Sequence, residues 1–285
     1  MNPQLPDYKN AKEFFMSQNS AIGVFDSGLG GLCAVRELSR LLPNENIIYF
    51  GDTGRVPYGT KSRETIRKYT KEDARFLLSH GVKAILAACG TVSSNALECI
   101  REITDVPVFG VVEDAAKAAY NASRTKRIGV IGTQATVNSG IFKRKIEAID
   151  PNAVILQKAC PLFVSLVEYG FTADGDEVTR LACERYLAEF GGEVDTLIMG
   201  CTHFPIIKEH IAKALPGVTL INPAKESAKA MAAEFDAKGL LSSSREKGEV
   251  RYFVSDDPAG FAASASIFLG ESEGIFAEKV DIDKI

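Results

Sequence analysis

The sequence has no excess of basic residues, no long apolar run and no closely paired cysteines, and each absence argues against a class of protein. Its 33 Lys and Arg residues are outnumbered by 37 Asp and Glu residues, which gives a net charge of −4. Because nucleic-acid binding relies on basic side chains that neutralise phosphates, we expect no nucleic-acid partner. No apolar run reaches the length that spans a bilayer, so we expect no membrane partner. Residues 1–20 lack the apolar centre of a secretory signal.

The cysteines and histidines do not follow a metal or disulfide pattern. The six cysteines are Cys33, Cys89, Cys99, Cys160, Cys183 and Cys201. They contain no C-x-x-C pair, and the three histidines add no zinc-ligand spacing, so we expect no metal. A chain of this length without a secretory signal is expected to be cytoplasmic, reduced and free of disulfides. Cys33, Cys99 and Cys183 fall within helical patterns, which predicts small buried core residues.

Strand and helix patterns alternate along the chain. With 285 residues, 46% of them hydrophobic, the chain can form one large domain or two smaller ones. The expected strands are 21–25, 46–50, 83–88, 106–112, 127–131, 153–156, 195–199, 218–221 and 251–254. The expected helices are 31–42, 62–80, 91–102, 137–149, 176–190, 206–214, 226–236 and 256–269. This alternation predicts an α/β fold with mainly parallel sheets that helices flank on both faces.

The pattern restarts near the middle of the chain. Residues 21–27 resemble residues 127–133, since both are a strand that turns into a loop rich in Gly, Ser or Thr. Two similar α/β halves related by a pseudo-twofold axis would explain this, although two generic strand–loop–helix units can also match by chance. We predict an N-terminal extension, helical around 11–16, and two domains with a site in the cleft between them. Their bounds are 1–20 for the extension, 21–112 plus 222–285 for the discontinuous first domain, and 113–221 for the second.

Cys89 and Cys201 are the strongest candidates for chemistry. Each ends an apolar run typical of a buried strand, one in each half, and the carboxyl ends of parallel strands are where α/β proteins bind ligands. Two opposed thiols suit the removal of a proton from one face of a carbon and its addition to the other. A thiol near a helix start and hydrogen-bond donors has a pKa lowered from about 8.5 toward neutrality, as a thiolate base requires. The alternative is that both are buried core thiols.

Four other side chains are candidates to support these thiols. Asp26 and Ser27 follow a predicted strand, where a carboxylate can accept from an ammonium group or orient an acid–base group. His203 lies two residues after Cys201 and either assists proton transfer or caps a helix. Glu168 ends an apolar stretch and either accepts a hydrogen bond from His203 or is a solvated helix residue.

No cofactor motif accompanies these residues. The glycines of 26–31 do not have the G-x-G-x-x-G spacing of a dinucleotide loop, and the phosphate-loop lysine is missing. Some of these glycines serve a tight turn. No metal constellation and no lysine in a pyridoxal context is present, so cofactor-independent chemistry is the simplest interpretation.

Several motifs in order resemble those of one family. They are residues 22–31, 49–53, 56–59, the loop at Cys89, 131–137, 160–164 and 200–205. The chain resembles the glutamate racemases, within the cofactor-independent aspartate/glutamate racemase superfamily, from about residue 21 to residue 221. The elements 57–59 and 201–203 resemble glutamate racemases more than aspartate racemases.

The resemblance implies a mechanism and a substrate site. By resemblance, Cys89 acts on D-glutamate and Cys201 on L-glutamate, while Asp26 and His203 support them and Glu168 is the acidic partner of His203. It also implies a homodimer that supplies D-glutamate for peptidoglycan, and thus for cell-wall biogenesis and cell shape. The residues that it implies for substrate binding are Asp26, Ser27, Pro57, Tyr58, Gly59, Gly90, Thr91, Thr133, Thr136, Thr202 and His203.

Two positions depart from the family pattern. The family usually has Asn after the first cysteine, where this chain has Gly90, which cannot offer a side chain to the substrate. The family also tends to have Pro after Glu113, where this chain has Asp114, and we expect that difference to be structural only. Two alternatives stay open: a racemase of another acidic amino acid such as aspartate, and a non-catalytic homologue that binds amino acids or regulates.

Overall fold

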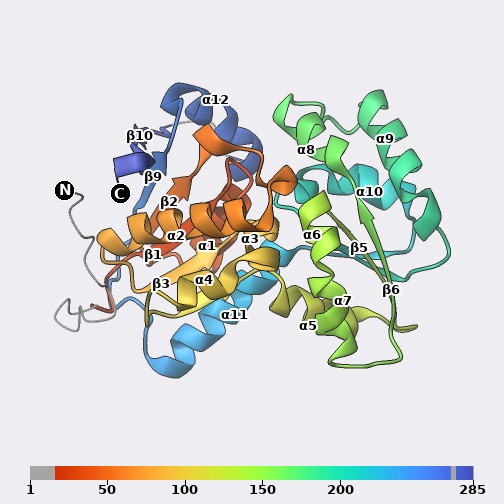
Figure 1. Ribbon diagram of the computed structural model, residues 1–285, viewed down its shortest axis with the longest axis horizontal. Helices are drawn as coiled ribbons and strands as arrows, with labels where there is room; N and C mark the ends of the chain where they lie inside the picture. The colour runs from red at the N-terminus through yellow and green to blue at the C-terminus, as the bar shows by residue number, and fades with distance from the viewer. Residues whose placement is uncertain (1–16, 271–273, 285) are drawn as a thin grey trace.

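Two parallel sheets lie side by side in the computed structural model, which describes residues 17–270 and 274–284 (Figure 1). The helix expected at 11–16, and with it most of the N-terminal extension, lies outside the described residues. Within those two ranges, no helix is long and apolar enough to cross a membrane. The α/β class predicted from the alternating pattern is confirmed.

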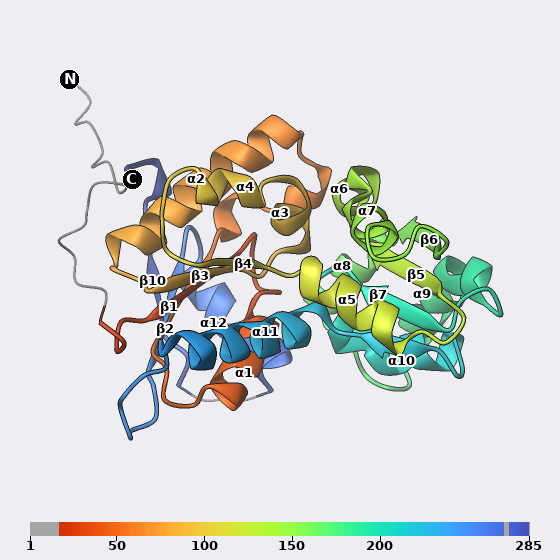
Figure 2. The ribbon, with the colours of Figure 1, turned by 90° about the horizontal axis from the view of Figure 1, so that it is seen from below.

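The first sheet has six parallel strands in the order β10-β9-β2-β1-β3-β4. Every residue of β1, β2 and β3 is buried, because helices cover both faces and the apolar residues therefore run on without alternation. Figure 2 shows α2 on one face and α1, α11 and α12 on the other. The strands are β1 (Ile22–Asp26), β2 (Ile47–Gly51), β3 (Ala84–Ala87), β4 (Val108–Gly110), β9 (Val250–Val254) and β10 (Ala277–Lys279).

The second sheet repeats the topology of the first. Its four parallel strands have the order β6-β5-β7-β8, which matches the order β2-β1-β3-β4 strand for strand. The strands are β5 (Arg127–Gly132), β6 (Val154–Ala159), β7 (Thr196–Met199) and β8 (Thr219–Ile221). The repeat suggested by two short sequence matches is therefore present in the strand order, while the pseudo-twofold relation stays a prediction.

Most helices lie where the pattern places them. The Ser62 side chain accepts from Thr65 N at the start of α2, and the Asp176 side chain accepts from Thr179 N at the start of α9, as N-caps do. These helices are α1 (Leu32–Leu41), α2 (Arg63–Ser79), α9 (Glu177–Leu187), α10 (Lys208–Ala214), α11 (Pro223–Lys238) and α12 (Pro258–Leu269). Short 3₁₀ turns are η1 (Thr53–Arg55), η2 (Tyr58–Thr60), η3 (Ala188–Phe190), η4 (Phe204–Ile207) and η5 (Ile282–Lys284).

Two expected helices are each split in two, and two further helices were not expected. The helix expected at 91–102 is two helices that meet at Ala96, and the one expected at 137–149 is interrupted at Gly140, which has a left-handed φ of 62°. Two helices were missed: one is rich in alanine, and the other is mostly apolar, with polar side chains only at Ser165 and Glu168. The split helices are α3 (Gly90–Asn95), α4 (Leu97–Arg101), α6 (Gln134–Ser139) and α7 (Ile141–Glu147), and the missed ones are α5 (Glu113–Ala122) and α8 (Pro161–Glu168).

The chain returns to the first sheet after the second is complete. Strand β9 pairs with β2 in parallel register, and the buried Lys83 helps to hold the returning segment. Lys83 Nζ lies 2.5 Å from Glu45 Oε2 and donates to Leu240 O at 2.9 Å. We propose the division 21–112 plus 222–285 and 113–221 as two domains, because the membership of the sheets supports it.

Candidate active site

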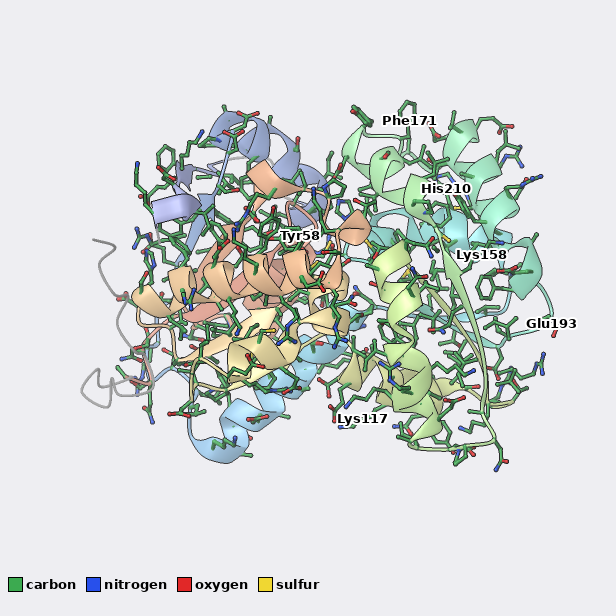
Figure 3. All side chains as sticks on the ribbon, viewed as in Figure 1. Tyr58, Lys117, Lys158, Phe171, Glu193 and His210 are labelled. Atoms are coloured by element: carbon green, nitrogen blue, oxygen red, sulfur yellow. The ribbon has the colours of Figure 1, made fainter. Side chains whose placement is uncertain are left out.

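A cavity of about 440 Å³ lies where the carboxyl ends of the two sheets meet. Loops that follow β1, β3, β5 and β7 line it, together with residues 56–60 and one face of α8. Figure 3 shows Tyr58, from η2, near the boundary between the two halves. The predicted site residues on its wall are Ser27, Pro57, Tyr58, Gly59, Cys89, Gly90, Thr91, Thr133, Glu168, Cys201, Thr202 and His203. Asp26 and Thr136, also predicted, are buried and are not among the lining residues.

The two thiols hold equivalent places in the two sheets. Cys89 comes two residues after β3 and is the N-cap residue of α3, while Cys201 comes two residues after β7. The strands are extended by backbone bonds just before the thiols, from Ala88 N to Phe25 O and from Gly200 N to Ile131 O. Cys89 is 5% exposed and Cys201 is 8% exposed, and both line the cavity. Both thiols are therefore nearly buried, and the exposed part of each faces the same cavity.

The surroundings of Cys89 are anionic. Its Sγ donates to Ser27 Oγ at 3.6 Å, and the fully buried Asp26 accepts from Gly28 N at 3.0 Å. The other oxygen of Asp26, Oδ1, has no hydrogen-bond partner within the described chain. Burial first, and then the charge of Asp26, raises the pKa of Cys89 to about 12. Burial also raises the pKa of Asp26, against the opposing positive charge of His203.

This differs from the expectation of a pKa lowered toward neutrality at Cys89. The expected helix start is present, but α3 is only six residues long. Desolvation of a thiolate outweighs the donors, because burial disfavours the charged form of any acid. In the free protein Cys89 is therefore a thiol.

The surroundings of Cys201 are cationic. His203 Nδ1 lies 3.8 Å from Cys201 Sγ, and His203 Nε2 lies 3.0 Å from Glu168 Oε1. Burial works against a charge on His203, but the hydrogen bonds to Cys201 and Glu168 raise its pKa to about 10. The imidazole is thus protonated at neutral pH and donates from both nitrogens. Of the two interpretations left open for Glu168, the contact with His203 is the one observed.

Hydroxyl groups join the two halves across the cavity. Thr91 Oγ1, after β3, lies 3.0 Å from Thr133 Oγ1, after β5. Thr133 in turn donates to Thr136 Oγ1 at 3.1 Å and accepts from Thr136 N as the N-cap of α6. Thr136 therefore orients Thr133 from behind the wall. The Tyr58 hydroxyl is engaged with Asp52 and Asp73, so it does not serve the cavity.

The loops of the two thiols approach each other closely at Gly90. A Cβ atom placed on Gly90 would lie 2.3 Å from Gly200 O, far inside contact distance. At Gly30, in the loop after β1, a Cβ atom would lie 2.0 Å from Thr202 Oγ1. The glycine that departs from the family pattern is therefore a point where only a bare backbone fits this arrangement.

The sequence interpretation missed the wall that α8 provides. Pro161, Val164, Ser165 and Glu168 line the cavity and are spaced i, i+3, i+4 and i+7, which is one face of a helix. That spacing is the signal in the sequence, and it lies within the mainly apolar residues 160–168. The other lining residues that were not predicted are Gly28, Val56, Thr60, Gln134 and Tyr169.

The chemistry of the wall limits what the cavity can do. No Lys or Arg is among the lining residues, so the charged side chains there are Glu168 and His203. The described ranges contain no group of three or more His, Cys, Asp or Glu side chains placed to hold a metal ion. Two thiols on one cavity, one beside a carboxylate and one beside an imidazolium, can exchange protons with a small polar ligand between them.

Comparison with known proteins gives consistent matches. The family described as Asp/Glu/Hydantoin racemase matches residues 33–231. A glutamate racemase of Geobacter metallireducens is 44% identical over 258 residues, which cover 89% of this chain and 94% of that protein. One of Chlorobaculum tepidum is 45% identical over 258 residues, covering 90% and 94%. The crystal structure of glutamate racemase from Francisella tularensis in complex with D-glutamate has a TM-score of 0.88 and 40% identity, covering 94% of this chain and all of that one.

Proposed function

Since the chain belongs to the Asp/Glu/Hydantoin racemase family, we propose that it is a glutamate racemase, an isomerase that interconverts L-glutamate and D-glutamate without a cofactor. The observation that carries this proposal is the pair of strand-end thiols on one cavity. The relatives from Geobacter metallireducens and Chlorobaculum tepidum are glutamate racemases that align over nearly their whole length, and the Francisella tularensis structure holds D-glutamate.

We assign the two proton transfers to the two thiols. The Cys201 thiolate removes the α-proton of L-glutamate, and the Cys89 thiol gives its proton to the opposite face of the carbanion-like carbon. The products are D-glutamate, a Cys201 thiol and a Cys89 thiolate, so the return reaction uses the same groups in reverse. The imidazolium of His203 lies 3.8 Å from Cys201 Sγ, while burial and Asp26 keep the proton on Cys89. We therefore assign Cys89 as the proton donor in the reaction from L-glutamate.

Neutral donors hold the charged substrate. Ser27, Thr91, Thr133 and Thr202 line the cavity with hydroxyl groups, and no Lys or Arg is on its wall. Removal of the α-proton spreads negative charge toward the α-carboxylate, so preorganised donors there stabilise the transition state more than the ground state. The two thiols are nearly buried, and electrostatic interactions are stronger where groups are removed from water.

Incubation with single amino acids in deuterium oxide tests the proposed function. With L-glutamate we expect loss of optical rotation together with α-deuteration, and with L-aspartate neither. Racemisation of aspartate but not glutamate would assign the chain to the alternative substrate. Binding of glutamate without any turnover would assign it to the non-catalytic alternative.

The wider role follows from the product. We propose that the protein is a homodimer in the cytoplasm and supplies D-glutamate for peptidoglycan, and hence for cell-wall biogenesis and cell shape. Deletion of the gene is expected to make growth depend on added D-glutamate, and light scattering of the purified protein checks the dimer. Growth without D-glutamate in a strain that has no other source of it would contradict the role.

A further inference from the structure

A buried polar cluster lies behind residues 57–59, which form one wall of the cavity, here called the 57–59 wall. It joins the loop after β2, the helix α2 and the segment after β9, through Asp52, Arg55, Tyr58, Asp73 and Ser255. Asp52 and Asp73 are fully buried, and Tyr58 is 1% exposed. None of these groups has a part in the proton transfers assigned to the thiols.

The hydrogen atoms of this cluster do not suffice if both aspartates are ionised. The Tyr58 hydroxyl is within hydrogen-bond distance of Asp52 Oδ2 and, at 3.0 Å, of Asp73 Oδ2. A phenol has one hydrogen and donates it to one acceptor. One of the two carboxyl groups must therefore supply the hydrogen for the other contact, or a buried oxygen pair is left in repulsion.

The partners of each aspartate decide which one carries the hydrogen. Asp52 accepts from Arg55 Nε at 2.6 Å, from Ser255 Oγ at 2.7 Å and from Tyr58, which suits a carboxylate. Apart from its contact with the Tyr58 hydroxyl at Oδ2, which that hydroxyl shares with Asp52, Asp73 accepts from Arg55 Nη2 at 3.0 Å through Oδ1. The second hydrogen therefore belongs on Asp73.

The charges around Asp73 agree with this assignment. Burial first, and then the charge of Asp52, raises the pKa of Asp73 well above its usual range, while Arg55 opposes the shift. With Asp52, Glu72 and Asp73 all ionised, three carboxylates would contact the single guanidinium group of Arg55. The charged and titratable groups that surround Asp73 are Asp52 and Arg55 from the loop after β2, Tyr58 from η2, and Tyr69, Glu72 and, through Glu72, Lys68 from α2.

We propose that Asp73 is a positioning residue that is protonated in the folded protein at neutral pH, and that its proton holds Tyr58, and with it the 57–59 wall, in place. The wall matters because Gly59 packs against Thr133 of the second half, where a Cβ atom would lie 2.8 Å from Thr133 Cβ. Loss of the proton leaves two carboxylates on one hydroxyl hydrogen and loosens that contact. The consequence for substrate binding rests on the proposed function, but the protonation state itself does not.

The pH dependence of unfolding tests the protonation state directly. Asp73→Asn keeps an acceptor for Arg55 and offers an N–H to the Tyr58 oxygen, so it mimics the protonated acid without a proton to lose. Wild-type Asp73 holds its proton when folded and releases it when unfolded, so the stability of the wild type should fall relative to this variant as pH rises. We expect the ratio of their unfolding constants to change by about tenfold per pH unit between pH 5 and 7.

This test has a matched control, Glu72→Gln, and a second readout, the infrared spectrum of the wild type. Glu72→Gln also alters a carboxylate on Arg55, but a partly exposed one, and its ratio to wild type should not show that slope. If Asp73→Asn does not fold, the infrared band of a protonated carboxyl in wild type at pH 7 should still be present and should persist in Asp26→Asn. A flat ratio, or no such band, would overturn the proposal.

Racemisation kinetics test the positioning role. At neutral pH we expect the KM of Asp73→Asn for glutamate to stay near that of wild type, while Asp73→Ala raises it about tenfold by displacing the wall. At alkaline pH the KM of wild type should rise above that of Asp73→Asn. Equal KM for all three proteins at every pH would contradict the positioning role. Absence of racemisation in wild type would instead contradict the proposed function, and the unfolding result would stand.

Discussion

The two thiols hold equivalent places in the two sheets but lie beside side chains of opposite charge. Cys89 and Cys201 follow the corresponding strands β3 and β7 of two sheets with the same strand order. Asp26 lies beside the first thiol, whereas the second has His203, whose pKa is raised to about 10. A duplicated fold thus provides two equivalent positions, and the charged side chain beside each thiol decides which thiol holds the proton. Substitutions that alter one thiol or its neighbour at a time test this difference.

Removal of either thiol should have the largest effect. Cys89→Ser and Cys201→Ser each delete a group that transfers a proton, and a positioned acid or base contributes about 10²–10⁴-fold. We expect racemisation measured by circular dichroism to fall by about 10³-fold or more in both variants. Each variant should still exchange the α-proton of only the enantiomer that faces the remaining thiol. Near-normal rates in both directions for either variant would show that the two-base assignment is wrong.

Neutralisation of Asp26 should have the next largest effect, and on one side only. In Asp26→Asn the second cause of the high pKa of Cys89 is gone, so that pKa should fall below about 12 while burial remains. The rate of alkylation of Cys89 against pH checks this, with Cys201→Ser as the background so that only one active-site thiol reacts. We expect racemisation to fall by about 10²-fold.

The equilibrium constant provides a check on the kinetics of Asp26→Asn. L-glutamate and D-glutamate have equal free energy, so kcat/KM must fall equally in both directions. The kcat values for L-glutamate and for D-glutamate can still change by different factors. The larger decrease identifies the direction of proton transfer that Asp26 assists. An unchanged alkylation profile would mean that Asp26 does not influence Cys89.

A side chain at position 90 should press the two loops apart. Gly90→Asn restores the residue that the family usually has, but its Cβ atom meets Gly200 O at 2.3 Å. We expect kcat/KM to fall by about 10- to 10²-fold, because small displacements of reacting groups are costly. Gly90→Ala has the same Cβ without the amide, and should lose a similar amount. A gain of activity in Gly90→Asn alone would show that the amide binds substrate and that the loops can yield.

The sequence was sufficient for features that are local along the chain. Cys89 and Cys201 were found because a buried strand and the loop after it are short contiguous patterns. The approach of Gly90 to Gly200, and the engagement of the Tyr58 hydroxyl with Asp73, depend on segments that meet only in three dimensions. The high pKa of Cys89 was missed for the same reason, since burial is set by the surrounding elements and not by neighbours in sequence.

Glu168→Gln should have the smallest effect, because Glu168 acts through His203 and its side chain is 40% exposed. The raised pKa of His203 means that protonation stabilises the fold fully below pH about 6.5 and that this stability is lost as pH rises through about 10. Without the Glu168 charge the pKa of His203 should fall, so the loss should begin at lower pH, with about 1 kcal/mol at stake after solvent screening. Thermal unfolding against pH measures this, and the ring protons of His203 report its pKa by NMR. Glu184→Gln, on the exposed face of α9, is the control. An unchanged titration of His203 would mean that Cys201 alone raises its pKa. The positive charge beside Cys201 would then be a property of the Cys201–His203 pair and would not depend on Glu168.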